Sequence, residues 1–165
     1  MGRLASLLEL LEAAHGAGAR LGVDDVMPFL GEAGDVAPWE LTDTIDRGDT
    51  ATAIELVRRM LGAGRHPLQL LATLHTHYAR MLRLDGADVA DEAQAAAALG
   101  MTGSTFPAKK ALAQSRRLGH EGVARAIELL ARADIDLKGA RDLPGELVME
   151  VLVARLSRLG GRSKR

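Results

Sequence analysis

Histidine offers the widest range of metal and proton-transfer chemistry of the residue types in this chain, which has five of them. His75 and His77 are the closest pair in the sequence. On a helix, residues two apart point about 200° away from each other, so these two imidazoles cannot bind one metal ion. The zinc motif HExxH is absent, and no Asp or Glu is placed to complete a site. We therefore predict ordinary helix histidines, with no bound metal ion and no cofactor.

A catalytic serine would require a strained turn with a base beside it. The motif GxSxG is absent, and the serines fit helix caps or helix surfaces: Ser6, Ser104, Ser115 and Ser157. The glycine-rich segments GAGAR and GAGRH do not match the phosphate-binding motif GxxxxGK[ST]. Asp134 and Asp136 are two residues apart on a predicted helix, so their carboxylates face different ways. The sequence therefore predicts no catalytic residue, and a chain that is not itself an enzyme.

Basic side chains form short clusters, and Lys138 and Arg141 lie together in a predicted interhelical turn. The net charge of −1 gives no whole-molecule attraction to nucleic acid. The few aromatic residues do not alternate with cations, so no base-stacking platform is predicted. We interpret the basic clusters as solvated helix faces. A DNA-phosphate contact by Lys138 and Arg141 is the weaker alternative.

The composition favours a helical globular protein. The 165 residues fit one ordinary domain, or one domain with an appendage. Apolar residues make up 47% of the chain but aromatic residues only 2%, so the core must consist of aliphatic side chains and methionine, which favour closely packed helices. The absence of cysteine excludes disulfides and thiolate metal sites. No apolar run approaches the ~20 residues that span a bilayer, so no membrane association is predicted.

Helical periodicity recurs along the chain, whereas strand signals are nearly absent. Leu70, Leu74 and Tyr78 recur at helical spacing after Pro67, and Gly119 is a predicted helix end. We predict an all-α fold of about nine helices. The predicted units are a small helical piece at 1–34, a linker at 31–36, a helical bundle at 35–160 and a basic disordered tail at 161–165.

The segment 133–156 contains two helical patterns on either side of a short polar turn at 138–142. The final helix, predicted at 145–159, is apolar around most of its circumference, which is typical of a helix buried on more than one side. Some of its apolar residues can pack into the chain's own core: Val148, Leu152 and Leu159. Met149 and Val153 are then candidates for contact with a neighbouring subunit. The alternative, given equal weight, is a helix buried wholly within this domain.

Taken in order, several segments resemble the C-terminal domain of the bacterial DNA polymerase III delta subunit. The family has a tryptophan near its first helix, a helix after a Gly-Asp turn, and then a turn of the form GxxP. Here Trp39, Gly48-Asp49 and the GRHP sequence at 64–67 occupy those places. The segment 128–156 resembles the family's last two helices. Some family members have an aromatic residue in the turn between them, where this chain has Arg141.

The resemblance implies a non-catalytic subunit fragment of the replicative clamp loader, made of part of a helical lid at 1–34 and a collar at 35–160. The collar would bind the delta-prime and gamma/tau subunits, while the sliding clamp would be contacted only through an N-terminal module with no counterpart here. Primer-template DNA would be touched weakly or indirectly. The expected location is the cytoplasm, at the nucleoid-associated replisome. The abrupt helical start suggests a fragment of a longer protein.

Two alternatives stay open at this point. One is the collar of a different clamp-loader-like ATPase of the AAA+ class. The other is a helical nucleic-acid-binding domain, which the net charge of −1 and the scattered basic residues disfavour.

Overall fold

A computed structural model describes residues 11, 22, 36–87, 89–103 and 105–162. These residues form six α-helices and no strand, which confirms the predicted all-α class. The helices, in chain order, are α3 (Pro38–Arg47), α4 (Thr50–Gly62), α5 (Pro67–Leu84), α6 (Glu92–Ala98), α7 (Phe106–Ile135) and α8 (Gly145–Arg162). The predicted count of about nine is not matched. Two of those nine helices and the predicted 1–34 unit lie almost entirely outside the described residues, and two others are one helix.

Local sequence signals explain where the helices begin and end. Proline occupies the first turn of α3 and α5, where its missing N–H is not needed. The Asp49 carboxylate caps α4 by accepting a hydrogen bond from the Thr52 amide at 3.2 Å. Gly48 ends α3 with φ 78°, a left-handed conformation that glycine adopts without steric cost. The helix predicted after Pro67 is therefore confirmed.

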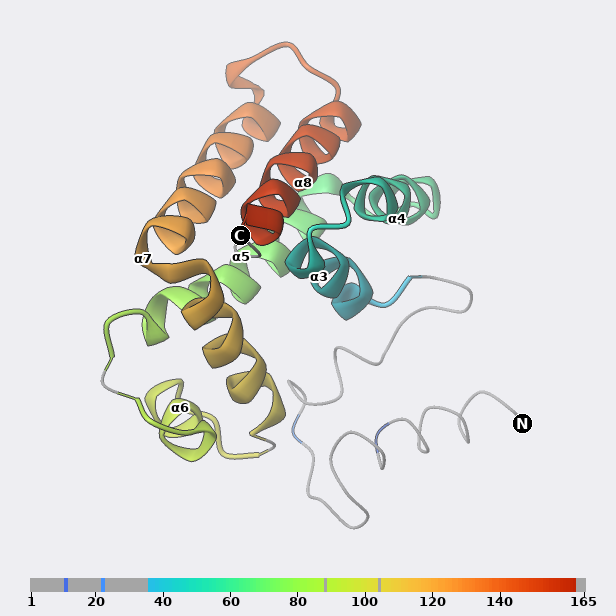
Figure 1. Cartoon of the computed structure of the whole chain (residues 1–165). Coiled ribbons are helices and arrows are strands. Elements are labelled where there is room, and N and C mark those ends of the chain that lie inside the picture. Colours follow the sequence, from blue (N-terminus) through green and yellow to red (C-terminus); the bar gives the residue numbers. More distant parts are fainter. Residues whose placement is uncertain (1–10, 12–21, 23–35, 88, 104, 163–165) are drawn as a thin grey trace, which may run out of the picture.

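Gly119 lies at the predicted boundary between two helices, which follow each other so closely that they count as one element. Its φ of 67° and ψ of 171° interrupt the helical geometry, but the chain resumes the helix at once without a loop. The result is one long bent element, α7, whose two halves run in different directions (Figure 1). A positive φ is available to glycine because it lacks a Cβ atom, so this residue can form the kink between the two helical halves.

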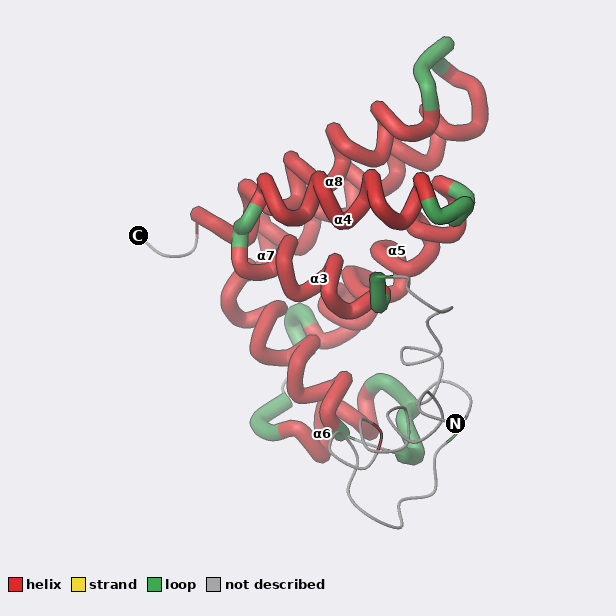
Figure 2. Tube along the Cα trace, turned by 90° about the vertical axis from the view of Figure 1, so that its right-hand side faces the viewer, coloured by secondary structure: helices red, strands yellow, loops and turns green. Residues whose placement is uncertain are grey.

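The bend allows α7 to serve two hydrophobic cores. The larger core combines α3, α4, α5, α8 and the half of α7 after Gly119, with Tyr78, Met60 and Leu74 fully buried. The smaller core combines the end of α5, α6 and the first half of α7, and alanines supply much of it. Figure 1 shows α8 lying between α7 and α4, and Figure 2 shows α6 at the opposite end of the molecule from the turn that joins α7 to α8.

The end of α8 extends further than predicted and packs closely against α3. The helix continues through Arg162, so residues 161 and 162, predicted as disordered tail, are helical. Gly160 is buried, and a Cβ atom there would lie 2.7 Å from the carbonyl oxygen of Ile45 at the end of α3. The absence of a side chain therefore permits the close approach of α8 and α3. Val36, predicted as part of a linker, belongs to the larger core.

Candidate interaction surface

The predicted polar turn joins α7 to α8 at one end of the molecule (Figure 1). It starts with a π-helical turn, Asp136–Ala140. Lys138 Nζ lies 2.7 Å from Asp134 Oδ2, and Arg141 Nε lies 3.4 Å from Asp136 Oδ1. The two candidate phosphate contacts are therefore both exposed, and each is paired with an acid of its own chain.

Met149 and Val153 lie inside the larger core, and neither side chain has any exposed surface. The expectation that they face a neighbouring subunit is therefore corrected by the structure, and the alternative of burial within this domain describes them. Val148 and Leu152 share that core as predicted, and Leu159 packs against it partly buried. The inward side of α8 is thus fully used for folding this chain.

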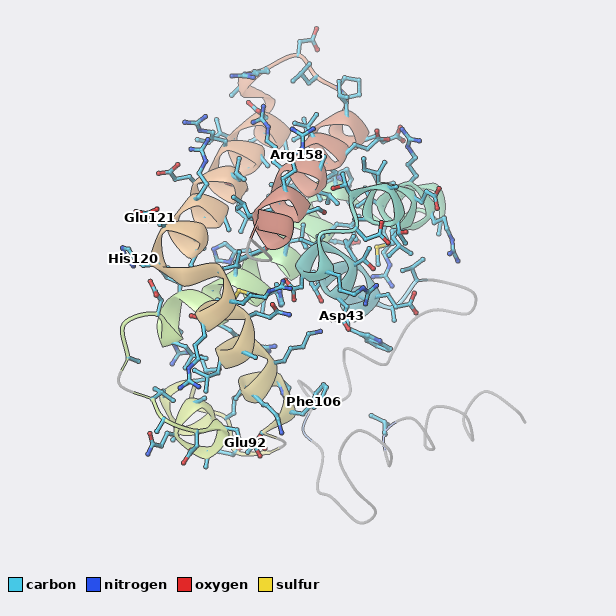
Figure 3. All side chains as sticks on the ribbon, viewed as in Figure 1. Asp43, Glu92, Phe106, His120, Glu121 and Arg158 are labelled. Carbon is cyan, nitrogen blue, oxygen red and sulfur yellow. The ribbon has the colours of Figure 1, made fainter. Side chains whose placement is uncertain are left out.

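The outward side of α8 carries a different set of residues, which we call the α8 strip. Its members follow one another at helical spacing and are all exposed: Leu147, Val151, Arg155 and Arg158. Figure 3 labels Arg158 on α8. The arginines one and two turns beyond Val151 mark the solvent side of a helix. The arginines at helical spacing after Val151 are the sequence signal that places Leu147 and Val151 on the solvent side, unlike Met149 and Val153.

A pocket of about 240 Å³ lies beside the strip, between α7 and α8. Leu129, Val148 and Leu152 form its buried floor, whereas Leu147 and Val151 are 45% and 40% exposed. The other residues that line it come from α7, the turn and α8: Arg132, Ala133, Asp136, Arg141, Leu143 and Arg155. An apolar floor with a half-exposed apolar edge is typical of a surface that another protein covers.

Two buried hydroxyl groups bond to the backbone of their own helices. Thr44 Oγ1 donates to the Glu40 carbonyl at 2.6 Å, and Ser157 Oγ donates to the Val153 carbonyl at 2.8 Å. Burial raises the pKa of the Tyr78 hydroxyl, which therefore stays protonated at neutral pH. The Thr44 and Ser157 hydroxyl groups therefore bond within their own helices.

The two histidines that are closest in the sequence, His75 and His77, lie in different surroundings. His77 Nε2 lies 3.2 Å from Asp46 Oδ1 near the larger core, whereas His75 is exposed. His120, which points away from the bundle in Figure 3, contacts Asp85 Oδ2 at 2.6 Å. Within the described residues, no three His, Cys, Asp or Glu side chains gather as metal ligands would.

Many basic side chains already have partners within the bundle. Arg58 donates through two nitrogens to Glu150, at 2.7 and 2.9 Å, and this hydrogen-bonded pair lowers the pKa of the Glu150 carboxyl. Lys109 pairs with Glu92 at 3.0 Å, and Lys110 pairs with Asp43. These residues therefore do not form the continuous stripe of free cations that would indicate a nucleic-acid surface.

Taken together, these features define a helical-bundle module with an apolar core and an exposed strip of two apolar residues and two arginines on the outward side of α8. None of the helices in the described part of the chain is long and apolar enough to cross a membrane. The family model for the DNA polymerase III delta subunit, C-terminal domain, matches residues 38–156, and the chain belongs to this family. The match begins at the first residue of α3 and ends within α8.

The family match confirms the resemblance inferred from the tryptophan and the two turns. It also assigns the chain a part in DNA replication related to the clamp loader. A search of curated proteins gave no match.

Proposed function

We propose that this chain is the collar module of a replicative clamp-loader subunit, and that it assembles with the collars of delta-prime and gamma/tau. The observation that carries the proposal is the family match over residues 38–156, which covers all the buried residues of the larger core except Val36. The apolar strip on the outward side of α8 supports it, because an exposed edge of this kind gives a module a surface for assembly.

In this proposal the chain contributes binding and not chemistry. The buried Thr44 and Ser157 hydroxyl groups bond to the chain's own backbone, and the role of the chain is to hold neighbouring subunits in place. The match favours a delta collar over the collar of another clamp-loader-like ATPase. The ion pairs that occupy Arg58, Lys109 and Lys110 argue against a dedicated nucleic-acid-binding domain. The cytoplasmic replisome is the location that this role implies.

Reconstitution tests the proposal directly. The full chain is mixed with the delta-prime and gamma/tau subunits of the same organism, and the molar mass of the product is measured by light scattering after gel filtration. We expect one complex that contains all three proteins. A chain that elutes alone, in the presence of both partners and at micromolar concentrations, would show that the proposed assembly role is wrong.

Lys138 and Arg141 are proposed as weak phosphate contacts within the assembled loader. Each lost phosphate contact lowers the slope of log affinity against log salt by about one. We therefore expect Lys138→Gln/Arg141→Gln to lower that slope for primed DNA by up to about two, measured by fluorescence anisotropy on the reconstituted loader. Lys109→Gln, in the first half of α7, serves as the control. An unchanged slope in the double variant would show that the turn does not contact DNA.

A further inference from the structure

The α8 strip continues past the helix into the turn. Leu143 lies four residues before Leu147 and is 41% exposed. Seven large apolar side chains are exposed among the described residues. Three of them line the same pocket: Leu143, Leu147 and Val151. We call this pocket and its apolar edge the α7–α8 groove. Because single exposed apolar residues are ordinary whereas clusters mark contact sites, the groove is a docking candidate on the described surface.

The charges around the groove are not balanced within the chain. Arg141 is paired with Asp136, which is the acidic residue among those that line the pocket. Arg132 on α7 and Arg155 on α8 also line it, and neither has an ion-pair partner among the described residues. The groove therefore combines an apolar floor with two surplus positive charges, one on each helix.

The spacing along α8 fits a helix as the occupant. Residues four apart on a helix are separated by about 6 Å along its axis, so Leu147, Val151 and Arg155 form a row about 12 Å long. A partner helix that lies along this row would place apolar side chains against the first two residues. A carboxylate one turn further along would then reach the guanidinium group of Arg155.

From this we infer that the α7–α8 groove receives an amphipathic helix of a neighbouring loader subunit, with Asp or Glu side chains beside its apolar stripe. The inference rests on the proposed function and specifies its contact surface. The apolar edge argues against DNA as the occupant, because phosphate groups would leave Leu147 and Val151 without a partner. The surplus cations argue against a second copy of the same groove, because four arginines would then meet.

Site-specific photocrosslinking identifies the occupant. The photoreactive residue p-benzoylphenylalanine is placed at Val151, and the full chain is assembled with delta-prime and gamma/tau before irradiation. The control position is Leu82, which is similarly exposed at 44% but lies on α5 outside the pocket. We expect an adduct at Val151, absent at Leu82, on a helical segment of a partner with acidic residues within one turn.

Other adducts would overturn the inference. These are an adduct with a second copy of this chain, with added primed DNA, or with a partner segment that lacks carboxylates. A complex that forms normally but gives no adduct at Val151 would overturn it as well.

Charge reversal tests the electrostatic part. We expect Arg132→Glu/Arg155→Glu to weaken assembly by about tenfold or more at low salt, with a smaller difference at high salt, because the repulsion is screened. The control, Arg59→Glu/Lys109→Glu, makes the same change of charge at exposed positions outside the pocket and should stay within about twofold of the unmodified chain. Circular dichroism on both variants verifies that the helices remain folded.

The outcomes separate the two proposals. If the unmodified chain fails to assemble, the proposed function is wrong and the groove loses its partner. If the unmodified chain assembles and the Arg132→Glu/Arg155→Glu variant does so equally well, only the assignment of the groove is wrong.

Discussion

The two sides of α8 are both apolar near the start of the helix, but they carry different residue types in its later turns. Met149 and Val153 lie on the inward side with no exposed surface, whereas Leu147 and Val151 lie on the outward side, nearly half exposed. The inward side continues into Leu156 and the buried Gly160. The outward side continues into arginines. Apolar composition therefore does not distinguish a folding side from a contact side; the residues of the later turns do.

The largest expected effect is the loss of the inward side. Met149→Glu/Val153→Glu would place two carboxylates in a core without partners, and the cost of burying unpaired charges exceeds the stability of a typical domain. We expect no cooperative thermal unfolding transition and a large loss of helical circular dichroism. A variant that folds normally would show that the inward side is not required for the core.

The next effect concerns the contact between the end of α8 and α3. Gly160→Ala would place a methyl group under 3 Å from the backbone oxygens of Ile45 and Asp46, which cannot move as a side chain can. We expect a loss of about 1–3 kcal/mol in the free energy of unfolding, measured by urea titration.

The adjacent glycine provides the control. A Cβ atom at Gly161 would meet only the Gly48 Cα, at 4.0 Å, which is ordinary contact. We expect Gly161→Ala to leave the free energy of unfolding unchanged or to raise it by up to about 1 kcal/mol, through helix propensity. Equal losses in both variants would contradict the close approach at Gly160.

The helical class and most helix starts were predictable because they depend on local chemistry. Pro38 and Pro67 begin helices since proline fits the first turn, and Asp49 caps one through its own carboxylate. These signals act within a few residues, so no knowledge of the tertiary structure is needed. The family resemblance was predictable for the same reason, as it depends on the tryptophan and the turns around these helix starts.

The positions that were not predictable depend on packing between distant segments. Gly119 looks like a helix end, but the two cores hold the chain in helix on both sides of it. Gly160 is the last residue before the predicted tail, and the sequence does not show that it permits contact with α3. The direction in which α8 faces was missed because an apolar helix has no obvious polar side, although Arg155 and Arg158 share the side of Leu147. Local rules cannot show which neighbour a residue meets.

A smaller effect on stability is expected from the outward side of α8. Leu147→Glu/Val151→Glu introduces the same two charges at the same spacing as in the inward variant, two residues earlier. Both positions are partly solvated, so the new carboxylates stay in water and the chain should keep a cooperative unfolding transition. Assembly with delta-prime and gamma/tau should be lost, because the apolar edge of the groove is removed. If this variant loses its fold as Met149→Glu/Val153→Glu is expected to, the proposed difference between the two sides of α8 is wrong.

The smallest effect is expected at the border between the two sides, where Glu150 of α8 pairs with Arg58 of α4. Arg58 is largely exposed, so Arg58→Ala should lower the thermal midpoint at neutral pH only slightly. The hydrogen bond from Arg58 lowers the pKa of Glu150 below its ordinary value of 4.5. A lowered pKa in the folded state means that the pair stabilises the fold above the ordinary value and loses this contribution as the pH falls through the lowered one. The difference in thermal midpoint between the unmodified chain and the variant should therefore disappear in acid. A difference that persists or grows below that range would show that Arg58 stabilises α4 and α8 through the packing of its aliphatic stem and not through its charge.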